Sequence, residues 1–272
     1  MLPLHYGYKI ISLRDIKINK IMIKLSYPDK VSIKVILLAI VSILAIPYYF
    51  IAGGTLLGFI IIRLVGTAFS ALGTIGHHRW LSHHSFVPHT LGRYLMWAGL
   101  VIYGIGKPLH LVIAHRLHHA HCDTALDPHS PNYHSWMNLW LGRFSTSSGV
   151  RYPKDFYRNK EAVFVNNHYW KLYAAFNIVL ALIDLKTALV FCPVIFTWSW
   201  ILTTVINYNG HVHNNTVTPT NLNFLISIIT FGEGLHKNHH NDQTNRSFAG
   251  KNQFDLGAVV VEKILMAKAP LK

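Results

Sequence analysis

The chain has 272 residues, of which 51% are hydrophobic and only 13% are charged. Soluble domains carry about 25% charged residues, so this composition disfavours an ordinary soluble domain and favours a membrane protein with one polar region. The net charge of +14 fits either a nucleic-acid partner or an anionic membrane surface, and the long apolar runs favour the membrane.

Residues 1–32 form a basic arm in which isoleucines are interspersed with lysines and arginines. A segment of this kind lies on a membrane surface as an interfacial helix or remains an extended tail. The sequence leaves both interpretations open.

Residues 33–255 contain two long apolar runs, one from Val31 to His77 and one from about Trp170 to Asn209. A helix needs about 20 mainly apolar residues to cross a bilayer, so each run is long enough for two crossings joined by a short turn. The expected fold is all-α, with four transmembrane helices near 33–50, 54–75, 168–185 and 188–209. The remaining residues, 256–272, are expected to form a C-terminal tail.

Basic residues occupy the N-terminal arm, the segment between the second and third expected helices, and the C-terminal part. The positive-inside rule therefore places all three regions, and both termini, on the cytoplasmic side of a multi-pass protein. The apolar segment 90–114 is interrupted by Gly104, Gly106 and Pro108. It is expected to form interfacial helices of a cytoplasmic cap, with a re-entrant helix as the alternative.

Histidine is concentrated in the segments expected to form this cap. In "HRLHH" and "HKNHH", histidines recur at i, i+3 and i+4, which places each triple on one helix face. In "NYNGH", Asn207 and His211 lie one turn apart. In "HRWLSH", His78 and His83 would point about 140° apart on an α-helix.

Clustered imidazoles repel when protonated and are costly to bury without partners. A metal ion resolves both problems because it takes the neutral nitrogen lone pairs. Nine imidazoles exceed the four ligands of a zinc ion, so the sequence predicts a two-metal site. Imidazole suits Zn, Cu, Fe and Ni, so ligand type does not choose the metal. With only three glutamates, the chain is unlike soluble di-iron bundles built on Glu-x-x-His.

Other polar residues near these motifs have less certain roles. His77, His84 and His121 are expected either to orient ligands or to lie at the surface. Asp123 and Asp127 are candidate acceptors for ligand histidines. Arg79 and Arg116 are expected to bind a carboxylate or a backbone carbonyl.

The ordered motifs "HRWLSH", "HRLHH", "NYNGH" and "GEGLHKNHH" resemble those of the integral-membrane fatty acid desaturases, specifically the stearoyl-CoA Δ9-desaturase branch. The resemblance covers roughly residues 33–255. It implies two iron ions, with Asn207 reaching a metal through water. The implied metal-binding histidines are His78, His83, His115, His118, His119, His211, His236, His239 and His240.

The resemblance implies an O2-dependent enzyme that introduces a cis double bond, at Δ9, into a saturated acyl chain. O2 is the co-substrate, and two electrons come from an external donor such as ferredoxin or cytochrome b5 with its reductase. The acyl carrier is CoA, acyl carrier protein or a membrane lipid. Ile113 and Ala114 stand where acyl-CoA enzymes have polar residues, which leaves the carrier open.

A desaturase must hold one methylene pair of the chain beside the metals, which requires an apolar tunnel. The resemblance places chain-length control in the second expected helix, where Gly66, Ser70 and Gly73 share one face. We expect these three residues to line the tunnel. Helix packing is the alternative role for small residues at this spacing.

Two other functions are compatible with histidine-rich membrane segments. A histidine-motif hydroxylase of an alkane, sterol or carotenoid would share the metals and differ in its product. A metal transporter predicts ionisable residues inside the crossings, which are scarce in this sequence. Nucleic-acid binding is disfavoured because the basic residues flank membrane helices rather than aromatic platforms.

Overall fold

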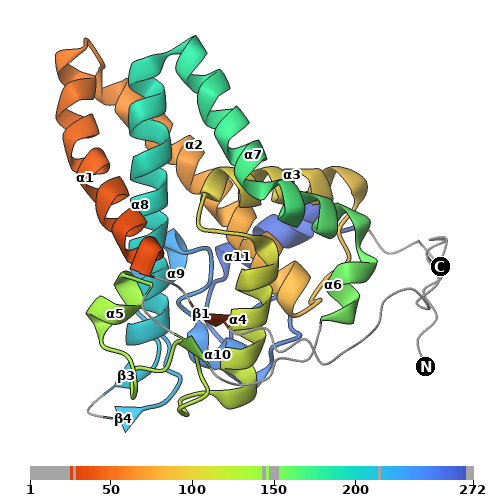
Figure 1. The fold of residues 1–272 in the computed structure, drawn as a ribbon. Helices are drawn as coiled ribbons and strands as arrows, with labels where there is room; N and C mark the ends of the chain where they lie inside the picture. Colours follow the sequence, from red (N-terminus) through yellow and green to blue (C-terminus); the bar gives the residue numbers. More distant parts are fainter. Residues whose placement is uncertain (1–24, 27–28, 143–144, 147–152, 214–215, 268–272) are drawn as a thin grey trace.

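The structure is a computed structural model that describes residues 25–26, 29–142, 145–146, 153–213 and 216–267. Most of the basic arm expected at 1–32 lies outside the described residues. Four long helices extend to one side of a cap of shorter helices (Figure 1). They are α1 (Asp29–Ile51), α2 (Leu56–Ile75), α7 (Lys160–Ile183) and α8 (Leu185–Asn209).

Shorter elements complete the described chain. The helices are α3 (Thr90–Tyr103), α4 (Pro108–His121), α5 (Trp136–Trp140), α6 (Lys154–Arg158), α9 (Phe224–Ile229), α10 (His236–Asn241) and α11 (Leu256–Val260), with π-helical segments η2 (Gly76–Ser82) and η3 (Val261–Leu265). Strand β1 (Leu25–Ser26) pairs antiparallel with β2 (Ser145–Thr146), and β3 (Val212–His213) pairs antiparallel with β4 (Thr216–Val217). The predicted helical architecture is confirmed.

Three segments are long and apolar enough to cross a membrane: Ile33–Ile51, Leu56–Ser82 and Leu185–Asn209. They contain three of the four expected crossings. The fourth, 168–185, falls in α7, which begins at Lys160 and carries Lys171. Helix α7 is not among the three segments that are long and apolar enough to cross a membrane. Its C-terminal residues Leu182 and Ile183 are nevertheless apolar and 82% and 76% exposed, as is typical of a lipid-facing surface.

Large apolar side chains are exposed along the long helices, among them Ile43, Leu44, Leu57 and Leu64, at 63–69%. Soluble monomers rarely expose large contiguous apolar patches. Together with the spans above, this surface makes the protein a candidate multi-pass membrane protein.

Helices α3 and α4 meet at an angle of 91°. The turn between them contains Gly104 and Gly106, whose φ angles of +78° and +147° are accessible to glycine. Pro108 then occupies the first position of α4, where its missing N–H costs no helical hydrogen bond. The break expected in segment 90–114 is therefore present. By length and composition the pair is a broken span or a re-entrant loop, so the alternative to interfacial helices stays open.

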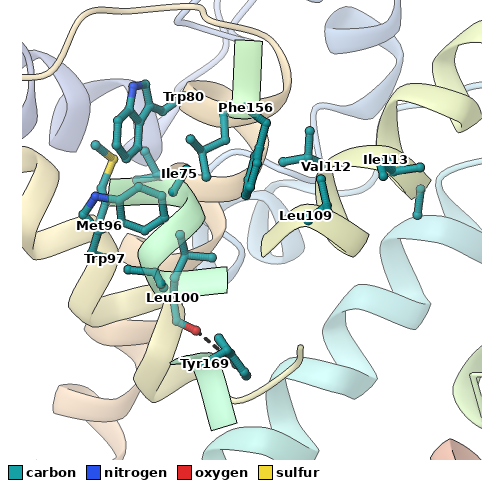
Figure 2. Packing of buried hydrophobic residues seen from close by; sticks show 14 of the residues in the cluster. Ile75, Trp80, Met96, Trp97, Leu100, Leu109, Val112, Ile113, Phe156 and Tyr169 are labelled. Atoms are coloured by element: carbon teal, nitrogen blue, oxygen red, sulfur yellow. Dashed lines mark hydrogen bonds between the residues drawn. The ribbon is translucent and has the colours of Figure 1, made fainter. Parts of the chain in front are cut away.

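A hydrophobic core joins α2, α3, α4 and α7 (Figure 2). Ile75, Met96, Leu100 and Val112 are fully buried in it. Tyr169 of α7 donates a hydrogen bond of 3.2 Å to the carbonyl of Leu100. This core fixes η2 and α4, the two elements that carry the first histidine motifs.

Within the expected tail, the described residues 256–267 include a segment that packs against the rest of the protein. Residues 256–265 form α11 and η3, and Val261 and Leu265 are fully buried. The carbonyl of Leu265 accepts a hydrogen bond from the backbone of His89 at 3.0 Å. The expected boundary at 255 was wrong for these residues because their apolar side chains complete the core beside α3.

Candidate metal centre

Four separate segments bring their histidines together below the long helices. Element η2 and the residue after it supply His78 and His83, and α4 supplies a triple. His211 follows the end of α8, and α10 supplies the second triple. The expected convergence of the motifs is therefore present in the structure.

The π-helical turn of η2 changes the relation between His78 and His83. The backbone N–H of His83 donates to the carbonyl of His78, five residues earlier, at 3.2 Å. This wider turn brings the two rings to the same side, with centroids 5.1 Å apart. The separation of about 140° expected for an α-helix is therefore absent, and both rings join one group.

The first group contains five imidazoles: His78, His83, His115, His119 and His239. The Nε2 atoms of His78 and His239 are 2.8 Å apart, and those of His83 and His115 are 2.7 Å apart. The Nε2 atom of His119 lies 3.0 Å from that of His115 and 2.9 Å from that of His239. We call this the five-histidine group.

The second group contains His118, His211, His236 and His240. The Nε2 atoms of His211 and His236 are 2.8 Å apart. The Nε2 atom of His240 lies 3.2 Å from those of His118 and His236. We call this the four-histidine group. The two groups are adjacent, since the ring centroids of His119 and His240 are 4.3 Å apart.

Carboxylates contact the outer nitrogens of three of these rings. The Nδ1 atom of His118 lies 2.9 Å from both oxygens of Asp127, and that of His211 lies 3.1 Å from Asp123. The Nδ1 atom of His78 contacts the carboxylate of Glu233. Because an ionised carboxylate can only accept, the two aspartate contacts favour Nδ1–H on His118 and His211 and leave their Nε2 lone pairs free for a metal.

The donor set fits metal ions. Facing Nε2 lone pairs repel each other unless a cation lies between them. The Nδ1 atoms of His119 and His239 are also buried and have no hydrogen-bond partner among the described residues. A cation held by the Nε2 atoms would offset the cost of burying these groups.

Burial also keeps these imidazoles neutral. It lowers the pKa of His83 to about 3, and the nearby charge of Arg116 adds to this shift. Burial lowers the pKa of His240 to about 4, although Asp123 and Asp127 oppose the shift. Burial lowers the pKa of His236 and His239 well below the ordinary value in the same way. These rings therefore offer lone pairs rather than protons at neutral pH.

A cavity leads from the long helices to the histidines. Along α2 its wall runs from Thr67 to Thr74, about 10 Å at 1.5 Å per residue. Opposite, it is lined by α8 residues from Trp198 to Asn207. It then reaches His78 and His115 of the five-histidine group and His236 of the four-histidine group. The cavity therefore opens onto both groups.

Only one of the three expected tunnel residues lies on this cavity. Ser70 lines it and forms a 2.9 Å hydrogen bond with Ser199 of α8. A side chain at Gly66 would collide with Ile195, and one at Gly73 would lie about 2.9 Å from the carbonyl oxygen of Gly99. The prediction was wrong for Gly66 and Gly73, because α8 and α3 pack directly against these glycines. The helix-packing alternative applies to both.

The contacts expected of the arginines and aspartates are present. Arg79 binds Asp255 and two backbone carbonyls. Arg116 binds Asp155 and the carbonyls of Leu81 and Ser82. Asp123 and Asp127 contact ligand histidines as described above. His84 pairs instead with Asp155, at 2.9 Å, away from the two groups.

Glu233 and Asp255 were not predicted from the sequence. Glu233 is 8% exposed and contacts His78, and burial raises its pKa to about 8 although Arg79 opposes the shift. The signal was present, because Glu233 stands in "GEGLH" just before the last triple and is one of only three glutamates. Asp255 lies outside every histidine motif, so no sequence motif indicated that it takes part in the site.

These features define a histidine-rich candidate metal centre at the base of apolar helices that could span a membrane. No family model matches the chain. Among characterised proteins, the chain is 32% identical over 185 residues to the acyl-CoA C20 Delta5-desaturase of Anemone leveillei. It is 27% identical over 177 residues to the sn-1 stearoyl-lipid 9-desaturase of Anabaena variabilis, and 29% identical over 182 residues to Delta-9 acyl-lipid desaturase 1 of Arabidopsis thaliana.

Each match covers 61% of this chain, and 57%, 65% and 58% of the respective relative. The chain thus spans less than two thirds of the length of these relatives. It is similar to fatty acid and lipid desaturases at about 30% identity. The relatives differ in the bond they desaturate and in the acyl carrier, so they do not fix a Δ9 or an acyl-CoA branch.

Proposed function

We propose that this protein is a membrane desaturase that removes two hydrogens from neighbouring carbons of a fatty acyl chain and leaves a cis double bond. O2, two external electrons and two protons combine with the removed hydrogens, and two water molecules are released. The observation that carries this proposal is the cavity between α2 and α8, which reaches imidazoles of both histidine groups. An acyl chain in this cavity would lie beside two metal ions. The similarity to fatty acid and lipid desaturases supports the same function.

In this proposal the five-histidine and four-histidine groups each hold one iron ion. Bound iron, with O2 and electrons, supplies the oxidising power that an unactivated alkyl chain requires. Asn207 lies on the cavity wall, a position from which it would reach a metal through water.

The chain itself positions the substrate and excludes water. The cavity wall includes the apolar side chains of Ile105, Leu111 and Leu139, which would pack against methylene groups. Several wall hydroxyls are already paired, as Ser70 is with Ser199 and Tyr103 with Thr203 at 3.3 Å. Paired hydroxyls are less available to hold water in the cavity, so the wall suits an alkyl chain.

We propose Δ9 as the bond formed in a saturated chain. The carrier is a thioester of CoA or acyl carrier protein, or a membrane lipid. Ile113 and Ala114 are 1% and 3% exposed and offer no polar surface to a nucleotide, which favours the lipid. Named relatives include both an acyl-CoA and an acyl-lipid desaturase, so the carrier must be measured.

We further propose four crossings, with α7 as the third, and the metal centre and both termini on the cytoplasmic side. This orientation rests on the basic residues in the arm, the cap and the C-terminal part. It would give a soluble electron donor, such as ferredoxin, or cytochrome b5 with its reductase, access to the cap.

Expression in a host that lacks its own desaturase, with an active reductase and electron donor, tests this function. Fatty-acid analysis of separated lipid classes should reveal a new monounsaturated chain. His118→Ala should abolish it, because His118 belongs to the four-histidine group. His121→Ala is the matched control, because His121 ends the same helix but belongs to neither group.

The products separate the alternatives. A hydroxylated chain would identify a hydroxylase instead. Unchanged lipids in the presence of a working donor would contradict the proposed function. The lipid class in which the new double bond first accumulates identifies the acyl carrier.

A further inference from the structure

Arg79 is fully buried in the cap, although it belongs to neither histidine group and does not line the cavity. It donates to both oxygens of Asp255, at 2.8 and 3.1 Å. It also donates to the carbonyls of Arg246 at 2.7 Å and Phe231 at 3.0 Å. The cost of burying a charged guanidinium is offset only by such bidentate pairing.

The guanidinium also reaches the metal centre through Glu233. Its Nη2 and Nε atoms lie 3.5 Å from Oε1 of Glu233. The other carboxylate oxygen of Glu233 contacts Nδ1 of His78. The contacts thus form a chain from Asp255 through Arg79 and Glu233 to His78, whose Nε2 atom faces His239 in the five-histidine group.

We propose that Arg79 and Asp255 are a positioning pair for the metal held by the five-histidine group. Asp255 fixes the guanidinium, the guanidinium fixes the carboxylate of Glu233, and this carboxylate orients the ring of His78. The inference rests on the proposed two-metal site, and it assigns a role to two residues that bind neither metal nor substrate.

The surroundings of Arg79 fix its position closely. The ring of Phe248 covers one face of the guanidinium, at 3.8 Å from its central carbon. A side chain at Gly257 would lie about 2.8 Å from Nη2 of Arg79, and Gly232 has a φ of +91° beside Asp255. The backbone is thus shaped around the guanidinium, which has little freedom to move away from Glu233.

A purely structural role is the competing explanation, because Asp255 also accepts from the backbone of Ala258 at 3.0 Å and so caps α11. A structural role predicts that loss of Arg79 destabilises the whole cap and lowers the binding affinity for both metals equally. A positioning role predicts that the affinity for only one metal falls. It also predicts that loss of Arg79 has no further effect on this affinity once Glu233 has been replaced by glutamine.

The test is a cobalt titration of the purified full-length protein in detergent, with metal counting and visible absorption spectra as readouts. We expect three variants, Arg79→Gln, Glu233→Gln and Asp255→Asn, each to lower the affinity for one of the two cobalt ions by about 10–100-fold. The affinity for the other ion should not change. The double variant Arg79→Gln/Glu233→Gln should be no weaker than Glu233→Gln alone, because both residues act in one chain.

The control is Arg246→Gln, whose side chain is exposed and pairs with Glu262, while only its backbone carbonyl contacts Arg79. It should bind both ions as the parent protein does. Three results would each overturn the positioning pair. The first is an equal loss of affinity for both ions with a lower melting temperature. The others are additive losses of affinity in the double variant and unchanged affinities in the single variants. A parent protein that binds fewer than two ions would overturn the metal centre itself, and the pair with it.

Discussion

At the residue scale, aspartates beside His118 and His211 favour the tautomer in which Nε2 of each ring carries the free lone pair. Asp127 illustrates this role, because both of its oxygens lie 2.9 Å from Nδ1 of His118. Its oxygens also accept from the backbones of Asp123 and His129, at 2.9 and 2.8 Å. These backbone donors hold the carboxylate in place.

Asp127→Asn tests this role. The amide keeps the shape of the side chain but has only one acceptor oxygen and no charge, so it holds the His118 tautomer less firmly. We expect the affinity of the four-histidine group for cobalt to fall about 10–100-fold, measured by titration. Asp184→Asn, in the distant loop between α7 and α8, is the control. An unchanged affinity in Asp127→Asn would show that this carboxylate does not orient the ligand.

A second aspartate predicts a pH effect on stability. Burial raises the pKa of Asp155, but hydrogen bonds from His84 and Arg116 outweigh it and hold the pKa below the ordinary value of 3.8. A lowered folded-state pKa gives stabilisation that is present above pH 3.8 and lost as the pH falls below it. The pair is partly exposed, so its contribution is about 0.5–1 kcal/mol.

Asp155→Asn should therefore lower the melting temperature at pH 7, and the difference from the parent protein should shrink as the pH falls below about 4. Melting curves in detergent at a series of pH values measure this. A difference that stays constant down to pH 3 would show that the charge of Asp155 is not the cause.

At the element scale, the crossing of α2 and α3 determines where the first histidine motif lies. Gly73 and Gly99 let the two backbones touch, and a side chain at Gly99 would lie about 2.6 Å from the backbone nitrogen of Gly73. Element η2 continues directly from α2, so a shift at this crossing would move His78.

Gly99→Ala should destabilise the protein by about 1–3 kcal/mol, because the added methyl group meets backbone that cannot move aside easily. It should also weaken cobalt binding by the five-histidine group. Thermal unfolding and cobalt titration measure the two effects. Gly250→Ala is the control, since its nearest neighbour is the end of the flexible Gln253 side chain. Equal behaviour of the two variants would contradict a close α2–α3 contact.

Comparison of these elements with the sequence shows which features are local. The triples in α4 and α10 follow from the i, i+3, i+4 spacing, which any α-helix presents on one face. The π-turn of η2 was not predicted, because hydrogen-bond spacing of five residues leaves no mark in the pattern of apolar residues. This turn nevertheless brings the rings of His78 and His83 to the same side of the helix.

Features that depend on tertiary packing were predicted least well. The division of nine histidines into groups of five and four depends on how α10 meets α4, which spacing does not encode. Gly66 and Gly73 looked like tunnel residues because their neighbours on α8 and α3 were unknown. Ser70 lines the cavity because its side of α2 faces α8, and its contact with substrate stays a prediction.

At the scale of the whole molecule, α4 and α10, which carry the two histidine triples, lie toward one end of the long helices. The α1–α2 and α7–α8 connections lie at the other end (Figure 1). If α1 and α2 cross a bilayer, the turn between them lies on the side opposite the cap. Ala52 is exposed in this turn, and Lys251 is exposed in the cap.

Ala52→Cys and Lys251→Cys, each made in full-length protein, test the arrangement in sealed membrane vesicles with a membrane-impermeant maleimide. We expect the cysteine at 251 to react only from the cytoplasmic side and the cysteine at 52 only from the opposite side. The parent protein gives the background from Cys122 and Cys192. Labelling of both positions from one side would contradict the proposed topology.

The central claim concerns the two adjacent groups of imidazoles, and iron analysis of the purified protein tests it most directly. Iron-loaded protein should contain two iron ions per chain, with X-ray absorption showing mainly nitrogen ligands. One ion per chain, no ion, or a coordination shell dominated by oxygen would contradict the account.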